Sequence, residues 1–349
     1  MKKAMAVVLA ALMLGGCSAL PGEERAFAVV LGISEKSGVW EAGTRIPTYQ
    51  TGGGYVTISA RGNSLGEALA LLNASAPMEL HYGQLRLLLF GKDLAASAQF
   101  PEVLRALSAR GEVRAQAALC VTEDNVLDVL DALEPATGSR LSKSLEAMMT
   151  SRQSAGVVPR ITLSDWLRMG ERQQAVLMNA ALENADNAMP GMDAAAGELA
   201  AKAAGKVQLS GGWLTNSAGQ VKASLTAMEM QLLSLLQGRL RQGTLSLPQG
   251  TATLLEASSS MELVGTEVQA KVRLRYSASN LTEEGLTQAL LDALHGLTSK
   301  LASAGCDALG VARQAMAGCA DLAQWHAMNW PERYPALTWR FVIEVEREA

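Results

Sequence analysis

Short, continuous apolar runs alternate with helix-like spacings through the first third of the chain. Runs at 26–33, 85–91 and 113–121 hold few polar residues, which predicts strands buried on both faces of a sheet. Residues 55–60 alternate between apolar and polar positions, as a strand does. Apolar residues at helical spacing predict helices in the intervals, at 65–75, 101–109 and 123–133. This alternation predicts an α/β or α+β sheet covered by helices.

The middle of the chain favours helices. Residues 139–190 are expected to be mainly helical, and Thr162 with Asp165 three positions later approximates a capping box. Residues 207–221 predict a strand and turn, and residues 228–237 predict a helix that ends at Gly238.

The last third has the clearest periodicity. Residues 268–276 alternate between apolar and charged or polar side chains, which predicts a strand with one wet face. A long helix is expected from Thr282 to Ala304, followed by an amphipathic strand from Trp339 to Val345. The buried stripe of that helix consists of leucines: Leu286, Leu290, Leu294, Leu297 and Leu301. This part therefore predicts an antiparallel sheet with a long helix laid on it.

These patterns divide the chain into five segments. The Ala/Gly-rich stretch 184–206 contains Pro190, has only Leu199 as a large apolar residue after Met192, and is expected to link two domains. The predicted order is a signal peptide (1–16), a short tether (17–25), an N-terminal α/β domain (26–183), the linker (184–206), and a C-terminal α+β domain (207–349) with room for two subdomains.

The first residues have the proportions of an export signal. Lys2 and Lys3 precede about eleven apolar positions, whereas a membrane-spanning helix needs roughly 18 to 20. The sequence Leu14-Gly15-Gly16-Cys17 resembles the bacterial lipobox, in which the cysteine thiol takes a diacylglycerol group and the chain is cut before it. The alternative is an ordinary signal peptide with a coincidental cysteine. We expect a lipidated Cys17 to anchor a body that is otherwise outside the membrane.

Composition narrows the class of partner. Hydrophobic residues make up 49% of the chain and charged residues 18%, as in a globular protein with a full core. Removal of residues 1–16 takes away Lys2 and Lys3, so the 30 basic side chains fall to 28 against 34 acidic ones, a net charge of −6. That balance argues against nucleic acid, which requires clustered lysine and arginine.

The remaining thiols do not form a metal-binding pattern. Cys120, Cys306 and Cys319 have neither Cys-x-x-Cys spacing nor a nearby histidine cluster, so no metal or cofactor is expected. Cys120 lies in an apolar run and is expected in the core. In an exported protein Cys306 and Cys319 are able to pair, and the sequence leaves that question open.

One catalytic motif matches. Gly62-Asn63-Ser64-Leu65-Gly66 fits the nucleophile elbow of serine hydrolases, with His295 or His326 as a later base. Only 47 mature residues, 17–63, precede Ser64, too few for the strands that normally come first, and His295 falls within the predicted long helix. The favoured interpretation is that Ser64 caps the helix at 65–75. His81 is expected to be a hydrogen-bonding turn residue, and no catalytic residue is predicted.

Four stretches, taken in order, resemble the Ger(x)C family, the C-subunit lipoproteins of spore nutrient germinant receptors. The first is the lipobox followed by "EERAFAVVLGI", and the second is "ISARGNSLGEALALLNASAPMELHYGQLRLLLFGKDLA". The third is "GGWLTNSAG" followed by "LTAMEMQLLSLLQG". The fourth is the closing order of alternating strand, long helix, "QWHAMNWPERYP" and last strand. Ser34, where the family usually has Asp, is a departure.

The resemblance implies three α/β-type domains of unusual topology and a non-catalytic protein. It also implies anchoring through Cys17 on the outer face of the inner spore membrane, with a polytopic A subunit and a transporter-like B subunit as partners. The leading hypothesis is therefore a receptor subunit that acts in assembly or signalling during germination. The alternatives are a solute-binding lipoprotein with a cleft between two lobes, and a serine hydrolase acting through Ser64.

Overall fold

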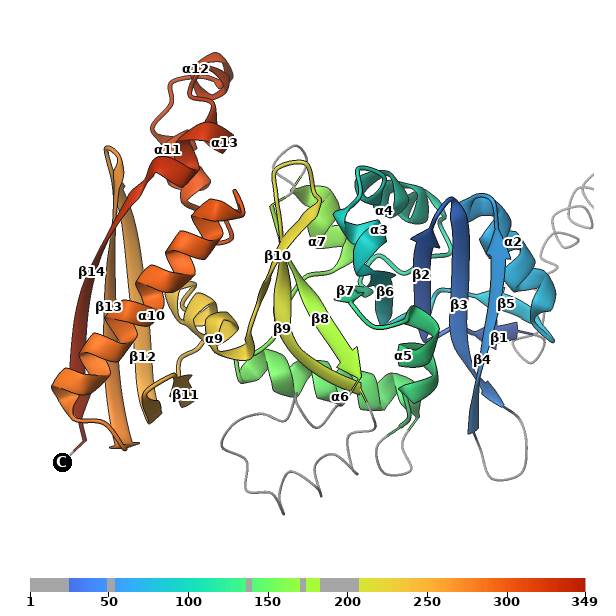
Figure 1. Ribbon diagram of the computed structural model, residues 1–349, viewed down its shortest axis with the longest axis horizontal. Coiled ribbons are helices and arrows are strands. Elements are labelled where there is room, and N and C mark those ends of the chain that lie inside the picture. Colours follow the sequence, from blue (N-terminus) through green and yellow to red (C-terminus); the bar gives the residue numbers. More distant parts are fainter. Residues whose placement is uncertain (1–24, 49–53, 136–139, 170–173, 183–206, 349) are drawn as a thin grey trace, which may run out of the picture.

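The computed structural model describes residues 25–48, 54–135, 140–169, 174–182 and 207–348. Three sheets occur among these residues: one of eight strands, one of four and one of two. The eight-stranded and four-stranded sheets lie beside each other along the long axis of the molecule (Figure 1). The α+β prediction is confirmed.

The eight-stranded sheet is parallel at its centre and antiparallel at both sides. Its strand order is β10-β9-β8-β7-β6-β2-β3-β4, with parallel pairing from β2 through β6 and β7 to β8. The bounds are β2 (Val30–Lys36), β3 (Val39–Thr48), β4 (Gly54–Gly62), β6 (Leu87–Gly91), β7 (Ala118–Thr122), β8 (Val176–Leu182), β9 (Val207–Thr215) and β10 (Val221–Leu225).

Helices cover both faces of this sheet. Leu88 and Phe90 of β6 face one core, while Leu87 and Leu89 face the other, which explains why this strand is apolar throughout. The first core is covered by α2 (Leu65–Ser75), α3 (Lys92–Ala96), α4 (Phe100–Ala109) and α7 (Leu163–Arg168), and the second by α5 (Val126–Ala132) and α6 (Leu141–Ser154). A small parallel pair, β1 (Arg25–Phe27) and β5 (Glu79–His81), lies beside the first core.

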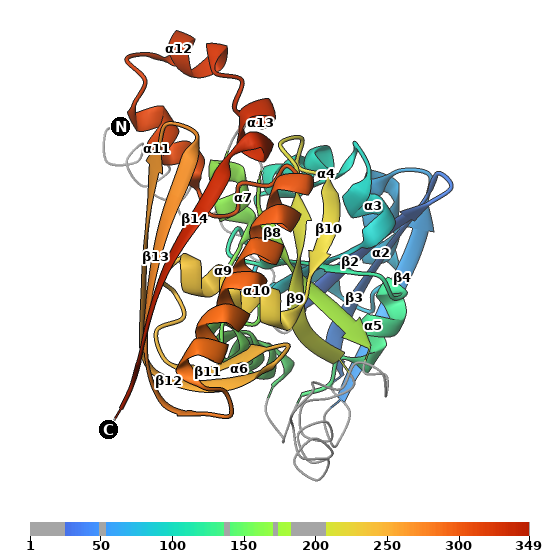
Figure 2. The ribbon, with the colours of Figure 1, turned by 60° about the vertical axis from the view of Figure 1, so that its left-hand side comes forward.

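The four-stranded sheet has one covered face. Its order is β11 (Gly243–Leu247), β12 (Gly250–Val264), β13 (Glu267–Ser279) and β14 (Thr338–Arg347). The long helix α10 (Glu283–Ser303) packs its predicted leucine stripe on one side of the sheet (Figure 2). Three short helices, α11 (Val311–Ala317), α12 (Leu322–Ala327) and α13 (Trp330–Arg333), and the 3-10 turn η4 (Tyr334–Ala336) follow.

This sheet is antiparallel from β11 to β13, as expected, but β14 pairs parallel to β13. The reason is the crossover. Because α10 carries the chain back along the sheet, the next strand starts from the same end as β13. Alternation alone does not reveal strand direction.

The eight-stranded sheet differs from the predicted elements in several places, and its strand β3 lies where the sequence predicted no element. Residues 176–182 form β8 inside the segment that was expected to be mainly helical, and β7 begins at Ala118 rather than near 113. The helix propensity of the Ala, Leu and Met residues in β8 is overridden because the strand is bracketed by β7 and β9. The capping box of Thr162 and Asp165 is confirmed.

The expected linker, 184–206, lies outside the described residues. Its flanking strands β8 and β9 are antiparallel neighbours, so the eight-stranded sheet continues to Leu225 and includes the start of the expected C-terminal domain at 207–349. The helix α9 (Ala227–Leu236) then leads to the four-stranded sheet. Among the described residues, no helix is long and apolar enough to cross a membrane.

Candidate functional site

The two larger sheets meet at α9, a helix that is buried almost all round. Every residue from Met230 to Leu236 is buried. Its leucines belong to one continuous core with Leu214 and Leu225 of the first sheet and Leu254 and Val272 of the second. A helix that is apolar on every side is stable only when it is enclosed by other elements. We call α9, Gly211–Trp213 and the loop 305–308 the junction.

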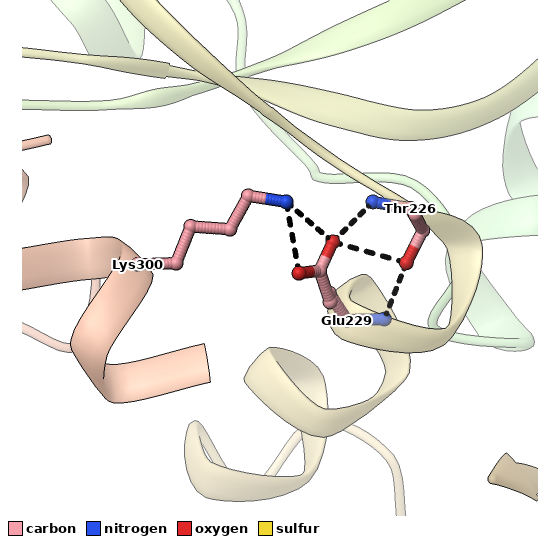
Figure 3. A network of polar contacts seen from close by, with 3 residues as sticks. All are labelled: Thr226, Glu229 and Lys300. Carbon is pink, nitrogen blue, oxygen red and sulfur yellow. Dashed lines mark hydrogen bonds and ion pairs between the residues drawn. The ribbon is translucent and has the colours of Figure 1, made fainter. Parts of the chain in front are cut away.

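The start of α9 is fixed by a reciprocal cap (Figure 3). The Glu229 backbone N–H donates to Thr226 Oγ1 at 3.2 Å, and the Thr226 N–H donates to Glu229 Oε2 at 2.7 Å. Lys300 of α10 adds an ion pair, with its Nζ 2.9 Å from each carboxylate oxygen of Glu229. The Glu229 side chain is only 16% exposed. The same carboxylate therefore caps one helix and holds another.

Two polar side chains on the buried face of α9 bind backbone groups on both sides. The Gln231 amide is 6% exposed and donates to Ala155 O at 3.2 Å and to Thr244 O at 2.8 Å. Its oxygen accepts the Ser246 N–H at 3.1 Å. One side chain thus joins the end of α6 to β11. Ser234 Oγ adds a bond to Gly156 O at 3.1 Å.

Two adjacent glycines allow β9 to approach its neighbours closely. Gly211 has φ +80°, and a Cβ there would lie 2.3 Å from Leu225 O. A Cβ on Gly212 would lie 2.7 Å from Val176 Cγ1. Trp213, which follows, donates from Nε1 to Asn179 Oδ1 at 2.9 Å and lies under the Lys92 ammonium, 5.1 Å from the ring centroid. The Gly-Gly-Trp sequence therefore serves close packing at the junction.

A second connection follows α10. The Asp307 N–H donates to Gln174 Oε1 at 2.8 Å, just before β8, and Gln237 Nε2 donates to Ala308 O at 2.8 Å. The Asp307 carboxylate accepts from Val311 N at 2.9 Å and Ala312 N at 2.6 Å. Burial raises the pKa of Asp307, and these backbone bonds oppose the shift. The loop is therefore held by the first sheet and holds α11 in turn.

The junction is a packed connection rather than an open cleft. Its polar atoms are satisfied by the chain itself, and its apolar residues belong to one core. Two hollows lie elsewhere, on the outer face of the four-stranded sheet, where charged side chains such as Lys271, Arg273 and Arg340 line them.

The structure does not assemble the residues of the hydrolase hypothesis. Ser64 Oγ accepts the Glu67 N–H at 3.2 Å and caps α2, which was the favoured interpretation. His295 lies on α10, at the other end of the molecule in Figure 1, with its ring 5.0 Å from that of Phe341. His326 lies on α12. His81 Nδ1 accepts the Gly83 N–H at 3.2 Å, which confirms the turn interpretation.

The thiols are separate. Cys120 is fully buried, as expected, and burial raises its pKa. Cys306 and Cys319 are both free, so the pairing left open by the sequence is not made in this structure. Cys306 Sγ lies 3.8 Å from Ala175 O, while Cys319 Sγ lies 3.4 Å from Ala315 O. Burial raises the pKa of Cys306 to about 12.

The lipobox residues Leu14, Gly15, Gly16 and Cys17 lie outside the described residues. Within the described ranges, no group of three or more His, Cys, Asp or Glu side chains is placed to hold a metal ion. Sequence reasoning missed the polar residues of the junction. Gln231 falls inside an apolar helix pattern, which is a signal for a buried polar connection, whereas nothing in the sequence pairs Lys300 with Glu229 or Asp307 with Gln174.

The comparisons point to one family. Residues 21–179 match the family described as "Spore germination protein N-terminal domain". The fold is similar to a solved structure titled "Crystal Structure of the GerBC protein", with a TM-score of 0.51 and 14% sequence identity, over 91% of this chain and 97% of that chain. No curated protein sequence matches.

Proposed function

The chain belongs to the Ger(x)C family of spore germination proteins, and from this premise we propose that it is the C subunit of a nutrient germinant receptor. The match of residues 21–179 to the germination family carries the proposal. A fold that resembles GerBC across 91% of this chain supports it.

In this proposal the protein is a lipoprotein on the outer face of the inner spore membrane. Diacylglycerol on Cys17 anchors it, and residues 18–25 form the tether, whose last residue, Arg25, is the first residue of β1. Each buried methylene contributes about 0.8 kcal/mol, and two acyl chains suffice for stable anchoring. A tether of this length holds the body near its partners at an effective concentration on the order of millimolar.

The proposed role is assembly or signalling without catalysis. The partners are the polytopic A and B subunits, and the C subunit contributes a stiff body with a contact surface. Three features of the described residues support this role: Ser64 acts as a helix cap, the junction is filled by α9, and Gln231 joins the end of α6 to β11. In this proposal, a displacement of one sheet moves the other through these contacts.

The test is Cys17→Ala, with Cys319→Ala as the matched control. Cys17→Ala is expected to release the protein from membranes and to impair nutrient-triggered germination, since the partners lose the local concentration that the tether gives. Cys319→Ala should leave both unchanged, because that thiol lies far along the chain on a short loop. Normal germination with a soluble Cys17→Ala protein would overturn the proposal.

A further inference from the structure

The last strand leaves a long, regular sheet edge. β14 pairs with β13 over ten consecutive residues, from Thr338 to Arg347, and is the terminal strand of its sheet (Figure 1). It contains no proline, glycine or bulge among these residues. Natural proteins usually protect such an edge, because its free N–H and C=O groups accept a further strand.

Some charged side chains on the outer face of β14 form ion pairs with the neighbouring strand, and others do not. Glu344 binds Arg273, with 2.7 Å between Arg273 Nε and Glu344 Oε2, and also binds Lys271, and these contacts lower its pKa. Arg340 and Glu346 are exposed and form no ion pair with any residue that the structure describes. One unpaired cation and one unpaired anion thus lie six residues apart on the same face.

That spacing is self-complementary. When two copies of β14 run antiparallel with Ile343 opposite Ile343, each residue faces the one equally far on the other side of position 343. Arg340 of each copy then faces Glu346 of the other, and opposite charges at facing positions stabilise a strand pair. Two equivalent ion pairs form at once, as two-fold symmetry requires.

The side chains on the inner face of β14 also fit this register. Trp339, Phe341, Ile343 and Val345 form a half-buried apolar row beside α10. In the paired arrangement Phe341 faces Val345, and Trp339 faces Arg347, which allows a cation–π contact. The apolar row of each copy is thereby covered by the other.

We propose that β14 is a docking edge for a second copy of this chain, which joins the two four-stranded sheets into one of eight strands. Pairing of two ten-residue strands lies at the small end of protein interfaces, so the dimer is transient in dilute solution. Confinement of both copies to one membrane raises their effective concentration and favours pairing.

The experiment uses the full-length chain in its native membrane. In a Cys319→Ser background, Ile343→Cys places a thiol on the two-fold axis, where facing Cα atoms lie about 5.5 Å apart, within the range that a disulfide spans. The matched control is Thr338→Cys on the same strand. In the proposed register its two copies lie about 33 Å apart, so no disulfide is possible. Mild oxidation should cross-link the first variant and not the second.

Charge exchange tests the register. In the Ile343→Cys background, Arg340→Glu should reduce cross-linking roughly tenfold, since it places two carboxylates opposite each other. The double variant Arg340→Glu/Glu346→Arg should restore it. Absence of cross-linking at 343, equal cross-linking at 338 and 343, or failure of the double variant to restore it would overturn the proposal. Membrane fractionation of the same samples reports anchoring separately, so loss of the anchor is not confused with loss of the dimer.

Discussion

The two large sheets bury their strands in different ways. The eight-stranded sheet has a core on each face, so its central strands are apolar throughout, as in Leu87 to Phe90. The four-stranded sheet is covered on one face only, by α9, α10 and the helices after α10, and β13 alternates along most of its length, with Val272 buried and Arg273 exposed. The first is built as a scaffold, while the second has a free face and a free edge available for contact.

The largest expected effect on stability comes from truncating a core residue of the first sheet. A surface residue of the second sheet serves as the comparison. Leu89→Ala removes a fully buried side chain between β6 and α5 and should lower the free energy of unfolding by about 2–5 kcal/mol. Val342→Ala, at a position that is 45% exposed, should change it by less than about 0.5 kcal/mol. Urea unfolding followed by circular dichroism measures both. Similar losses would contradict the two-core description.

The junction supplies the next largest effect. Gly211→Ala should lower the free energy of unfolding by about 1–3 kcal/mol, because φ is +80° and the new Cβ meets Leu225 O. Gly296→Ala on α10 is the control. Its Cβ meets nothing within 4 Å, so the helix should gain about 1 kcal/mol. Opposite signs in thermal melts are expected, and equal signs would count against the close approach of β9.

Gln231→Leu tests the polar connection between the end of α6 and β11. It leaves Ala155 O, Thr244 O and Ser246 N without their partner, at a cost of about 1–3 kcal/mol. Hydrogen exchange of the Ser246 amide should accelerate, since that N–H loses its acceptor. Gln288→Leu on the exposed side of α10 should leave this amide unchanged. An unaltered Ser246 exchange rate in Gln231→Leu would show that Gln231 does not hold β11.

Substitutions at two helix caps compare the two regions through smaller changes in the free energy of unfolding. Ser64→Ala should lower the free energy of unfolding by about 1 kcal/mol, because α2 buries Ala68, Leu69 and Leu72 against the first core. Asp321→Ala removes the equivalent cap of α12, a helix with no buried residue, and should fray it locally with little global loss. Equal global losses from the two variants would contradict this difference in burial.

The smallest expected effect is a pH dependence. Because burial raises the pKa of Asp307 in the folded state, the folded protein holds this proton more tightly than the unfolded chain. Its contribution to stability is therefore greatest below the ordinary aspartate pKa and declines as pH rises through the raised value. Asp307→Asn should remove this slope while its single amide oxygen keeps one of the two backbone bonds to Val311 and Ala312. If the free energies of unfolding of the original chain and of Asp307→Asn change in parallel between pH 3 and 8, the assigned role of Asp307 is contradicted.

Local patterns predicted most elements because they reflect burial directly. The leucine stripe of α10 and the alternation of β13 both appear as expected, with Leu294 and Val272 fully buried. The capping residues Ser64 and Thr162 also act as expected, since a cap depends on neighbours in sequence.

The strands β3 and β12 were not predicted, and the errors at β8, β14 and the junction have long-range causes. β8 was expected to be helical because its strand conformation is set by pairing with β7 and β9 rather than by its own residues. The parallel direction of β14 follows from the crossover of α10, and the contacts of Gln231 and Asp307 join segments that are distant in sequence. Lipidation of Cys17 stays a prediction.

The most direct test of the account is mass spectrometry of the N-terminal peptide from protein purified out of its native membrane. The account predicts a mature chain that begins at Cys17 and carries diacylglycerol on that thiol. A chain that keeps residues 1–16, or an unmodified Cys17 thiol in membrane-bound protein, would contradict it.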